Sequence, residues 1–363
     1  MSITVGFIGL GLIGGSIAKS LKKADSSIYI VAYNRSHAPL EQALSENVID
    51  ESAFDINDSF NKCDIIFLCT PVEYNSIYLS KAADVMKDGC IITDVGSVKG
   101  YIHKTVTELG LEHCFIGGHP MAGSEKTGYA ASSDILLENA YYPITPTAST
   151  SKEALDFYVS LVRKTGAIPI VTEPDIHDYA VAGISHVPHL IASALVNLVK
   201  DNDTSDELMK LLAAGGFKDI TRIASSSPEV WSQICLTNPV QISLILEKYI
   251  NMLTEIKDFV DAGDRDAISN MFAESREYRN SISITAKGPV LASYAMFCEI
   301  EDKEGALNSI TQLLSTNHIS IKNVEIIHNR EYHDGALRID FYDEHSAVKA
   351  YEKLCESGYT VYR

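Results

Sequence analysis

Residues 4–21 read TVGFIGLGLIGGSIAKSL and place Gly9, Gly11 and Gly14 in the spacing G-x-G-x-x-G. An apolar run of strand character comes directly before the glycines, and a helical pattern begins directly after them. In this context Gly9 permits a tight turn, Gly11 lets a pyrophosphate approach the backbone, and Gly14 lets the helix pack closely on the strand. The N–H groups at the start of the helix then face the phosphates. The stretch therefore predicts a dinucleotide site, and a purely structural turn is the alternative.

The end of the second predicted strand bears on which dinucleotide binds. A cofactor with a free ribose 2′-hydroxyl is usually held there by Asp or Glu, but Asn34 takes that place and is followed by Arg35 and Ser36. Losing the carboxylate removes repulsion toward a 2′-phosphate, and Arg35 can pair with that group. The sequence favours NADP over NAD, and a solvated Arg35 is the alternative. The predicted cofactor-binding residues are Gly9, Gly11, Leu12, Ile13, Gly14, Asn34, Arg35, Ser36 and Thr70.

The first 171 residues alternate short apolar runs with helical patterns. Most of the runs are continuously apolar, as expected when helices cover both faces of a parallel sheet. This order predicts a Rossmann-like, doubly wound α/β domain over residues 1–171. The predicted strands are Thr4–Ile8, Ile28–Tyr33, Ile65–Cys69, Ile91–Val95, Phe115–Gly117 and Ile168–Val171.

Residues 172–286 show long helical periodicity and almost no strand signal, which predicts an all-helical middle domain. Pro174 marks the first helix start, and Pro188, Pro228 and Pro239 divide the rest into several helices. One predicted helix carries a wide apolar stripe, which favours a dimer interface, with an ordinary bundle core as the equal alternative. The stripe consists of Ile242, Ile245, Leu246, Tyr249, Ile250, Leu253 and Ile256.

A short linker, Lys287–Pro289, precedes a compact unit over residues 291–363. Its elements follow the order βαββαβ, which is the ferredoxin-like α+β pattern. The predicted elements are strand Ser293–Ile300, helix Glu304–Ser315, strand Ile321–His328, strand Ala336–Tyr342, helix His345–Glu356 and strand Tyr359–Tyr362.

The composition of the 363-residue chain excludes several classes of protein. Lys and Arg number 30 against 48 Asp and Glu, so the net charge of −18 opposes binding to nucleic acid or to an anionic membrane. The 7 cysteines are odd in number and show no C-x-x-C spacing, so neither a disulfide framework nor a zinc site is predicted. We find no apolar stretch of about 18 residues and no basic signal-peptide region, and we expect a cytoplasmic protein.

Four further segments carry polar residues typical of a functional site. They are TDVGSVKG at 93–100, GGHPMAGSEKTG at 117–128, ISHVPH at 184–189 and GGFKDITRIASSSPEVW at 215–231. Together with the glycine turn, and in order along the chain, they resemble the prephenate dehydrogenases of tyrosine biosynthesis. The later sequence EIEDKEGALNSITQLLSTNHISIKNVEI, at 299–326, resembles an ACT regulatory domain.

The resemblance implies NAD(P)-dependent oxidative decarboxylation of prephenate to 4-hydroxyphenylpyruvate. In that reaction a hydride passes from the ring to the nicotinamide, the 4-hydroxyl loses its proton, and CO₂ leaves. The protein therefore needs a base at the hydroxyl and cations for two carboxylates.

His119 follows an apolar strand at the carboxyl edge of the sheet, where ligands bind. The resemblance makes it the base, and a structural loop histidine is the alternative. The resemblance also places the Ser97 hydroxyl between substrate and His119, which is compatible with a helix-cap role.

His186 and His189 are three residues apart on one predicted helix and share a face. The resemblance places His189 near the nicotinamide and the substrate, with His186 supporting it. A metal pair would lack a third ligand, so no metal is predicted.

Arg222 is the candidate for binding a substrate carboxylate, because a guanidinium binds a carboxylate with two hydrogen bonds. Asp219 would orient it and Lys218 would add positive charge, and a surface ion pair is the alternative.

Three more residues enter the substrate site by resemblance alone. Ser124 and Glu125 would lie at the mouth of the pocket, with Glu125 as a gate. Trp231, the only tryptophan, would cap the pocket, and burial in the helical core is the equal alternative.

In the C-terminal unit, Gly305 lies at the first strand–helix junction, where a glycine lets a ligand approach the backbone at a helix N-terminus. ACT-like domains bind amino acids at this place across a dimer, and Asn323 would be a contact from the partner. The resemblance implies tyrosine as a feedback inhibitor. A domain that only dimerises is the alternative.

Three other functions compete with this reading. Arogenate dehydrogenase is the nearest, because arogenate carries an amino group where prephenate carries a keto group; His189 is more typical of prephenate users. An oxidoreductase for β-hydroxy acids fits the glycine turn but not the His119 and Arg222 segments. A non-catalytic cofactor and amino-acid sensor has no need of a base and a carboxylate clamp, so Ser97, His119, His189 and Arg222 argue against it.

Overall fold

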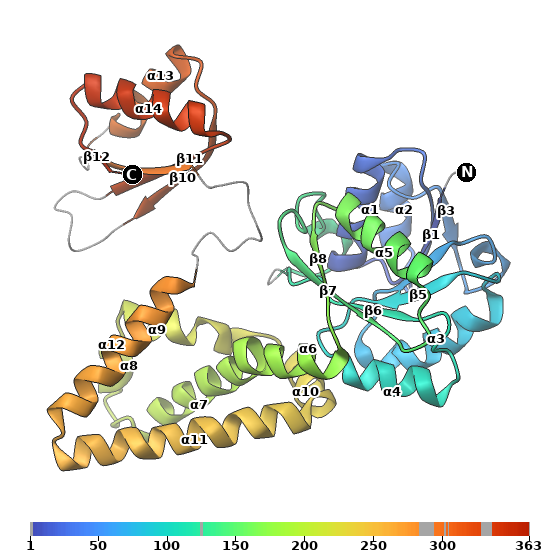
Figure 1. The fold of residues 1–363 in the computed structure, drawn as a ribbon, viewed down its shortest axis with the longest axis horizontal. Coiled ribbons are helices and arrows are strands. Elements are labelled where there is room, and N and C mark those ends of the chain that lie inside the picture. The colour runs from blue at the N-terminus through green and yellow to red at the C-terminus, as the bar shows by residue number, and fades with distance from the viewer. Residues whose placement is uncertain are drawn as a thin grey trace. The chain divides into compact units, whose positions relative to one another are not determined.

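The computed structural model describes residues 3–123, 126–282, 294–300, 303, 305–327 and 336–362. Its contacts divide the chain into two compact units, Met1–Ser281 and Ile282–Arg363. Figure 1 shows the first unit as a sheet lobe followed by long helices, and the second as a small sheet with two helices on it.

A five-stranded parallel sheet begins the first unit, in the order β3-β2-β1-β4-β5. The order reverses direction beside β1, and such a reversal opens a ligand crevice at the carboxyl ends of the strands. The strands are β1 (Thr4–Ile8), β2 (Tyr29–Tyr33), β3 (Glu51–Ala53), β4 (Ile65–Leu68) and β5 (Ile91–Asp94). The helices beside them are α1 (Leu12–Ala24), α2 (Ala38–Ser45), α3 (Val72–Val85) and α4 (Gly100–Glu108). The predicted Rossmann-like domain is confirmed.

A second sheet corrects the prediction for the rest of this lobe. β6 (Ile116–Gly118), β7 (Tyr141–Pro146) and β8 (Ile168–Val171) form three strands, in which β7 pairs antiparallel with β6 and parallel with β8. The last two predicted strands therefore lie outside the parallel sheet, apart from a parallel bridge between Ile92 and Phe115. Sequence analysis also missed β3 and β7. β3 is too short to show a period, and the two prolines of β7 argue against a central strand.

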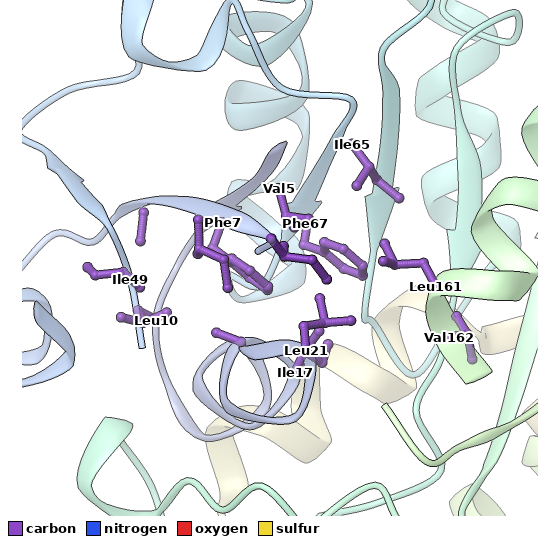
Figure 2. Close-up of a cluster of buried hydrophobic side chains, with 14 of the residues drawn as sticks. Val5, Phe7, Leu10, Ile17, Leu21, Ile49, Ile65, Phe67, Leu161 and Val162 are labelled. Atoms are coloured by element: carbon purple, nitrogen blue, oxygen red, sulfur yellow. The ribbon is translucent and has the colours of Figure 1, made fainter. Parts of the chain in front are cut away.

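The core of the sheet lobe lies on both faces of the parallel sheet. Phe7 on β1 stacks on Phe67 on β4, with ring centroids 5.2 Å apart. Ile17 and Leu21 of α1 bury these rings on one face, where α5 (Lys152–Lys164) also packs (Figure 2). A second buried cluster, under α3 and α4, covers the other face. Each such side chain stabilises the fold by about 1.5–3 kcal/mol, which fixes the strand ends that carry the polar segments.

The chain from Pro174 to Ser281 is helical and contains no strand. Its elements are α6 (Pro174–Val181), the π-helical turn η3 (Ala182–His186), α7 (Val187–Asn202), α8 (Leu208–Leu212), α9 (Gly215–Thr221), the 3₁₀ turn η4 (Arg222–Ser225), α10 (Pro228–Thr237), α11 (Pro239–Ala262) and α12 (Arg265–Ser281). Prolines occupy the first turn of α6, α7, α10 and α11, where a missing N–H breaks no helical hydrogen bond. The predicted helical middle domain, divided at its prolines, is confirmed.

The apolar stripe predicted on the long helix α11 falls into two halves. Ile242 is buried, and Ile245 and Leu246 pack beside it in the small core of this region. Ile250 and Leu253, by contrast, are 59% and 46% exposed. Large apolar side chains are also exposed elsewhere on α11 and on neighbouring helical elements, including Ile184, Leu198, Leu211, Leu212, Ile220, Leu236, Val240, Val260 and Phe272. This part of the molecule therefore presents far more apolar surface than its own core uses.

The sequence analysis expected no apolar stretch long enough to cross a membrane, but one helical run is long and apolar enough. Pro174–Asn202, from α6 through α7, is long and apolar enough to cross a membrane by length and composition alone. His177, Asp178 and His186 lie within it and are buried against other protein groups. Core helices of proteins outside membranes pass the same test of length and composition, so the run is weak evidence for a membrane span.

The second unit contains a four-stranded antiparallel sheet in the order β10-β11-β9-β12. Its elements are β9 (Tyr294–Glu299), α13 (Ala306–Thr316), β10 (Ile321–Ile327), β11 (Ala336–Phe341), α14 (Glu344–Glu356) and β12 (Val361–Tyr362). Both helices contribute to its core beside Met296, Cys298, Leu337 and Ile339. The predicted element order βαββαβ is therefore observed within the described residues. The predicted linker Lys287–Pro289 lies outside them.

Candidate active site

The glycine turn after β1 has the geometry that its spacing predicts. Gly9 has φ +98°, and a Cβ there would lie 2.5 Å from the carbonyl oxygen of Cys69. A Cβ on Gly14 would lie 2.4 Å from the carbonyl oxygen of Gly9. A Cβ on Gly11 would meet no atom within 4 Å. Packing therefore demands two of the glycines, while the third leaves the N-terminus of α1 open to a phosphate group.

Asn34 joins this turn to the end of β2. Its Oδ1 accepts a hydrogen bond from the Leu10 N–H at 3.0 Å, and its Nδ2 donates to Ser36, both to the carbonyl oxygen and to Oγ, at 3.0 Å. The neighbouring Arg35 is exposed. The carboxylate that would repel a 2′-phosphate is therefore replaced by an amide that is already hydrogen-bonded within the protein.

The remaining predicted cofactor residues lie nearby. Leu12 and Ile13 are the first residues of α1, and Thr70 follows β4, where its hydroxyl donates to Asn75 Oδ1 at 2.9 Å. The whole predicted set thus gathers at the carboxyl ends of β1, β2 and β4. This is the edge where the strand order reverses. The residues present fit a dinucleotide cofactor.

His119 follows β6 and is held by backbone and by a buried ion pair. Its N–H donates to the carbonyl oxygen of Pro143 at 3.0 Å. Beneath it, the fully buried Lys99 pairs with Asp94 and donates from Nζ to the carbonyl oxygen of Gly118 at 2.7 Å. The Gly118 N–H in turn faces Asp94 Oδ1 at 3.3 Å. A buried charge is stable only when paired in this way, and here the pair fixes the end of β6.

Three buried side chains follow in series from the His119 ring. His119 Nδ1 lies 2.8 Å from His177 Nε2, and His177 Nδ1 lies 2.8 Å from Asp178 Oδ1. Asp178 also accepts two backbone N–H groups at the start of α4. Oδ1 accepts from Lys99 at 2.8 Å, and Oδ2 accepts from Gly100 at 2.7 Å. The series thus connects the sheet lobe to α6.

The surroundings keep His119 uncharged at neutral pH. Burial, followed by the nearby His177, Lys99 and His186, lowers the pKa of His119 well below its usual value of 6.5. Burial likewise lowers the pKa of His186 to about 4. Burial lowers the pKa of Lys99, although Asp94 acts in the opposite direction. A neutral imidazole is the form that accepts a proton.

The two histidines of the ISHVPH segment both meet the tryptophan. The His189 ring stacks on Trp231 of α10 with centroids 3.5 Å apart, and the His186 ring meets it edge-on at 6.1 Å. His189 Nδ1 donates to the Ser185 carbonyl oxygen at 2.9 Å. His186 Nδ1 faces the amide of Asn238 at 3.3 Å. The described residues contain no cluster of His, Cys, Asp and Glu that could hold a metal ion.

The predicted carboxylate-binding residues are more open to solvent. Arg222 begins η4, and Lys218 and Asp219 lie on α9; all three are exposed. α9 and η4 both pack against α7, the helix that carries His189.

One described residue of the predicted site, Ser97, has no hydrogen bond to this cluster. Ser97 lies half-buried between β5 and α4, and its hydroxyl has no hydrogen bond to another described residue. Ser124 and Glu125 lie outside the described residues. A hollow of about 810 Å³ between Thr4, Lys62, Asp64 and Lys87 opens at the amino ends of the strands, whereas His119 and Ser97 follow the carboxyl ends of β6 and β5.

Sequence reasoning missed the residues that support His119. Lys99 was visible in the TDVGSVKG segment, but lysines are almost always exposed, so its burial could not be read from the sequence. His177 and Asp178 are adjacent in a helical pattern that carries no recognisable motif. Asn238 precedes a proline and resembles an ordinary helix start. Only the packing of α6 against α4 brings the first three together.

In the second unit, Gly305 has φ +84° and precedes α13, as its predicted position requires. The Asn323 side chain on β10 is exposed, and its Nδ2 lies 3.4 Å from Asp340 Oδ2. The fold therefore leaves both residues accessible.

A parallel sheet with a glycine turn, a buried neutral imidazole at its carboxyl edge and a following helical domain define a nucleotide-dependent oxidoreductase. Residues 17–171 match the family described as "Prephenate dehydrogenase, nucleotide-binding domain", and residues 173–274 match "Prephenate dehydrogenase, dimerization domain". The chain belongs to the prephenate dehydrogenase family, and the expectation that it is an oxidoreductase is confirmed.

Relatives of known name agree with this assignment. A prephenate dehydrogenase of Bacillus subtilis (strain 168) is 36% identical over 352 residues, covering 96% of this chain and 95% of the relative. A prephenate dehydrogenase of Lactococcus lactis subsp. cremoris is 35% identical, covering 92% of each chain. A cyclohexadienyl dehydrogenase of Zymomonas mobilis is 30% identical, covering 76% of this chain and 94% of the relative.

Solved structures show the same fold for the first unit. Prephenate dehydrogenase from Aquifex aeolicus, in complex with hydroxyphenyl propionate and NAD⁺, has a TM-score of 0.73 and 31% identity, over 78% of this chain and 99% of that one. Synechocystis arogenate dehydrogenase has a TM-score of 0.71 and 30% identity, over 77% of this chain and 99% of that one.

Proposed function

We propose that the chain oxidises and decarboxylates prephenate to 4-hydroxyphenylpyruvate with a nicotinamide cofactor, as a cytoplasmic step of tyrosine synthesis. The observation that carries the proposal is His119, a buried neutral imidazole at the edge of the sheet where the glycine turn also lies. The family membership and the two prephenate dehydrogenase relatives support the choice of substrate.

The side chains divide the chemistry between them. Gly9 and Gly11 would hold the pyrophosphate of the cofactor at their turn, and the cofactor when bound would supply the acceptor for the hydride of ring carbon C4. His119 accepts the proton of the 4-hydroxyl at Nε2, and the C–C bond to the ring carboxylate breaks to release CO₂ and leave an aromatic ring. A positioned general base contributes about 10²–10⁴-fold to such a rate. His189, stacked on Trp231, forms the wall beside the ring.

The cations bind the substrate carboxylates. Arg222 forms two parallel hydrogen bonds to one carboxylate, and Lys218 adds positive charge to a chain whose net charge is −18. Asp219 orients Arg222 once substrate is bound. Ser97 donates its hydroxyl to the substrate oxygen. Glu125 gates the entrance beside Ser124.

Prephenate is preferred to arogenate for two reasons. The relatives at 36% and 35% identity are prephenate dehydrogenases, whereas the arogenate dehydrogenase structure is 30% identical. By resemblance, a histidine at position 189 is also more typical of prephenate users than of arogenate users. The assay is reduced-cofactor formation by the purified full-length chain with prephenate or arogenate. Turnover of prephenate at least tenfold faster than turnover of arogenate supports the proposal. If the chain turns over neither substrate, the sensor function is supported instead.

For the cofactor we propose NADP, with NAD as the alternative. Asn34 offers no carboxylate to a ribose 2′-hydroxyl, and Arg35 is exposed beside it. We expect Arg35→Ala to raise the KM for NADP about tenfold and leave that for NAD unchanged, because one charge-assisted contact to phosphate is removed. Equal KM changes for the two cofactors, or tight binding of NAD alone, would contradict this choice.

We propose a homodimer formed through the helical region. The exposed half of the α11 stripe and the apolar residues around it form a surface of the kind that a second copy covers. Light scattering of the purified chain measures the mass directly, and a monomer at micromolar concentration would contradict the proposal.

We propose that the second unit is an ACT-like domain that binds tyrosine. Gly305 opens the backbone at the N-terminus of the 11-residue helix α13, and the B. subtilis relative matches 96% of this chain, so it includes this region. The two units have separate cores. A chain ending at Ser281 should keep its turnover and lose inhibition by tyrosine, which a coupling of ~1–3 kcal/mol would produce in the full chain. A shortened chain that is still inhibited would refute the regulatory role.

A further inference from the structure

The direction of the protons in the buried series His119–His177–Asp178 can be worked out from its far end. Both Asp178 oxygens accept backbone N–H groups, from Lys99 and Gly100, and a backbone N–H can only donate. Asp178 therefore acts as an ionised acceptor toward His177 as well. His177 Nδ1, 2.8 Å from Asp178 Oδ1, must carry a proton.

The next link follows from the first. A neutral imidazole has one N–H, so a proton on Nδ1 of His177 leaves its Nε2 as an acceptor. His119 Nδ1, 2.8 Å away, must then be the donor. The single proton of neutral His119 is thereby placed on Nδ1, and the lone pair is placed on Nε2.

His119 Nε2 is accessible from outside the protein. It has no hydrogen bond to a described residue, and within the described part no fully buried side-chain nitrogen or oxygen lacks a partner. An accessible ring nitrogen with a free lone pair is what a proton acceptor requires. The opposite tautomer would present an N–H to the substrate hydroxyl and could not accept its proton.

The groups around the series support this arrangement. On the β5–α4 side lie Asp94 and Lys99, which neutralise each other; on α6 lies Asp178; on η3 lies His186, which burial keeps neutral. The Lys99 charge opposes a second proton on His119. If His177 did become doubly protonated, its Nε2–H would donate to His119 Nδ1 and reverse the tautomer.

We propose that His177 is a positioning residue, anchored by Asp178, that holds His119 in the tautomer whose Nε2 is unprotonated. This inference rests on the proposed role of His119 as the base. It concerns residues that never touch the substrate, so their effect must pass through the protonation of His119 and leave binding unchanged.

The first test measures the tautomer itself, with no substrate. The ¹⁵N spectrum of the full-length, histidine-labelled chain distinguishes protonated from unprotonated ring nitrogens, and the His119→Asn variant assigns the His119 signals. We expect His119 to carry its proton on Nδ1 at pH 7.5. A wild-type His119 protonated on Nε2 overturns the proposal, whether or not prephenate is turned over; a chain with the expected tautomer that does not turn over prephenate refutes only the proposed function.

The second test compares three variants in turnover. In His177→Leu the buried His119 N–H loses its acceptor, so the imidazole moves its proton to Nε2, and we expect kcat to fall about 10- to 100-fold with KM unchanged, from the usual cost of an unsatisfied buried donor. In His177→Gln the amide oxygen can accept from His119 while the amide nitrogen donates to Asp178, so we expect kcat within about fivefold of wild type.

The matched control is His103→Leu. His103 is a half-buried histidine on α4 that faces Thr145 Oγ1 at 2.9 Å and lies outside the series. We expect this variant to lose stability and to keep its kcat. Wild-type kcat in His177→Leu, or an equal loss of kcat in His103→Leu and in His177→Gln, would overturn the proposal. If His177→Leu does not fold, the wild-type spectrum and the His177→Gln comparison still decide it.

Discussion

The two ends of the candidate active site are built in opposite ways. Around His119, every polar partner is buried and hydrogen-bonded within one chain, from Asp94 and Lys99 to His177 and Asp178. Around Arg222, the charged side chains of α9 and η4 are exposed and rest on a helical region with a small core of its own.

This difference separates two tasks. The proton acceptor must have one tautomer and one orientation before the substrate arrives, and only a buried network imposes that. The cations proposed to bind the substrate carboxylates are exposed, so under that proposal their geometry depends on the substrate. Changes at the His119 end should therefore affect kcat, and changes at the Arg222 end should affect binding.

The largest expected effect sharpens the first half of the comparison. His119→Asn removes the base but keeps a side-chain N–H able to donate to His177, so the fold survives. We expect kcat to fall at least ~10²-fold, with near-normal cofactor affinity measured by calorimetry. A variant of wild-type activity would end the assignment of His119, and loss of cofactor binding would show that the substitution acts on the fold instead.

Arg222→Ala tests the second half. We expect kcat/KM for prephenate to fall at least tenfold, and up to ~2–5 kcal/mol if the bound substrate fully desolvates the guanidinium. Because Arg222 is exposed, the midpoint of thermal unfolding should not change. Arg222→Lys serves as the control, because it keeps the charge and loses the geometry of two parallel hydrogen bonds. Its kcat/KM should lie between those of wild type and Arg222→Ala. A loss below tenfold, or a fall confined to kcat, would break the comparison.

The smallest expected effect concerns how the free energy of unfolding depends on pH. The unfolded chain protonates its histidines near pH 6.5, whereas burial lowers the pKa of folded His186 to about 4. The unfolded state thus binds more protons between these values, so the free energy of unfolding falls as pH falls from 6.5 to 4. We expect His186→Gln to remove ~2 kcal/mol of this dependence, measured by urea unfolding at several pH values. An unchanged slope in the variant would contradict the buried neutral state.

Particular residues show why part of this molecule was predictable and part was not. The glycine turn predicted the first strand, the first helix and the cofactor edge, because each glycine answers a local backbone requirement. The helical region followed from its periodicity and its prolines. The sequence motifs pointed to His119 and Arg222 as candidates. Only the structure shows that His119 is buried and that Arg222 is exposed.

The features that could not be predicted depend on contacts between segments far apart in the sequence. His177 lies 58 residues from its partner His119, and Asp178 lies 79 residues from Lys99. No local pattern records such a pairing. β7 was missed because its prolines mask a strand whose pairing is decided by its neighbours, and Lys99 was missed because only the buried Asp94 makes a buried lysine stable.

The π-helical turn η3 between α6 and α7 has a consequence for engineering. Such a turn amounts to one extra residue inserted into an α-helix. If substitutions turned Gly183–Ser185 into regular α-helix with no residue removed, everything after it would rotate by about 100° about the axis. His177 would stay where it is while His189 swung away from Trp231, so the chain would keep every reactive group and lose their alignment.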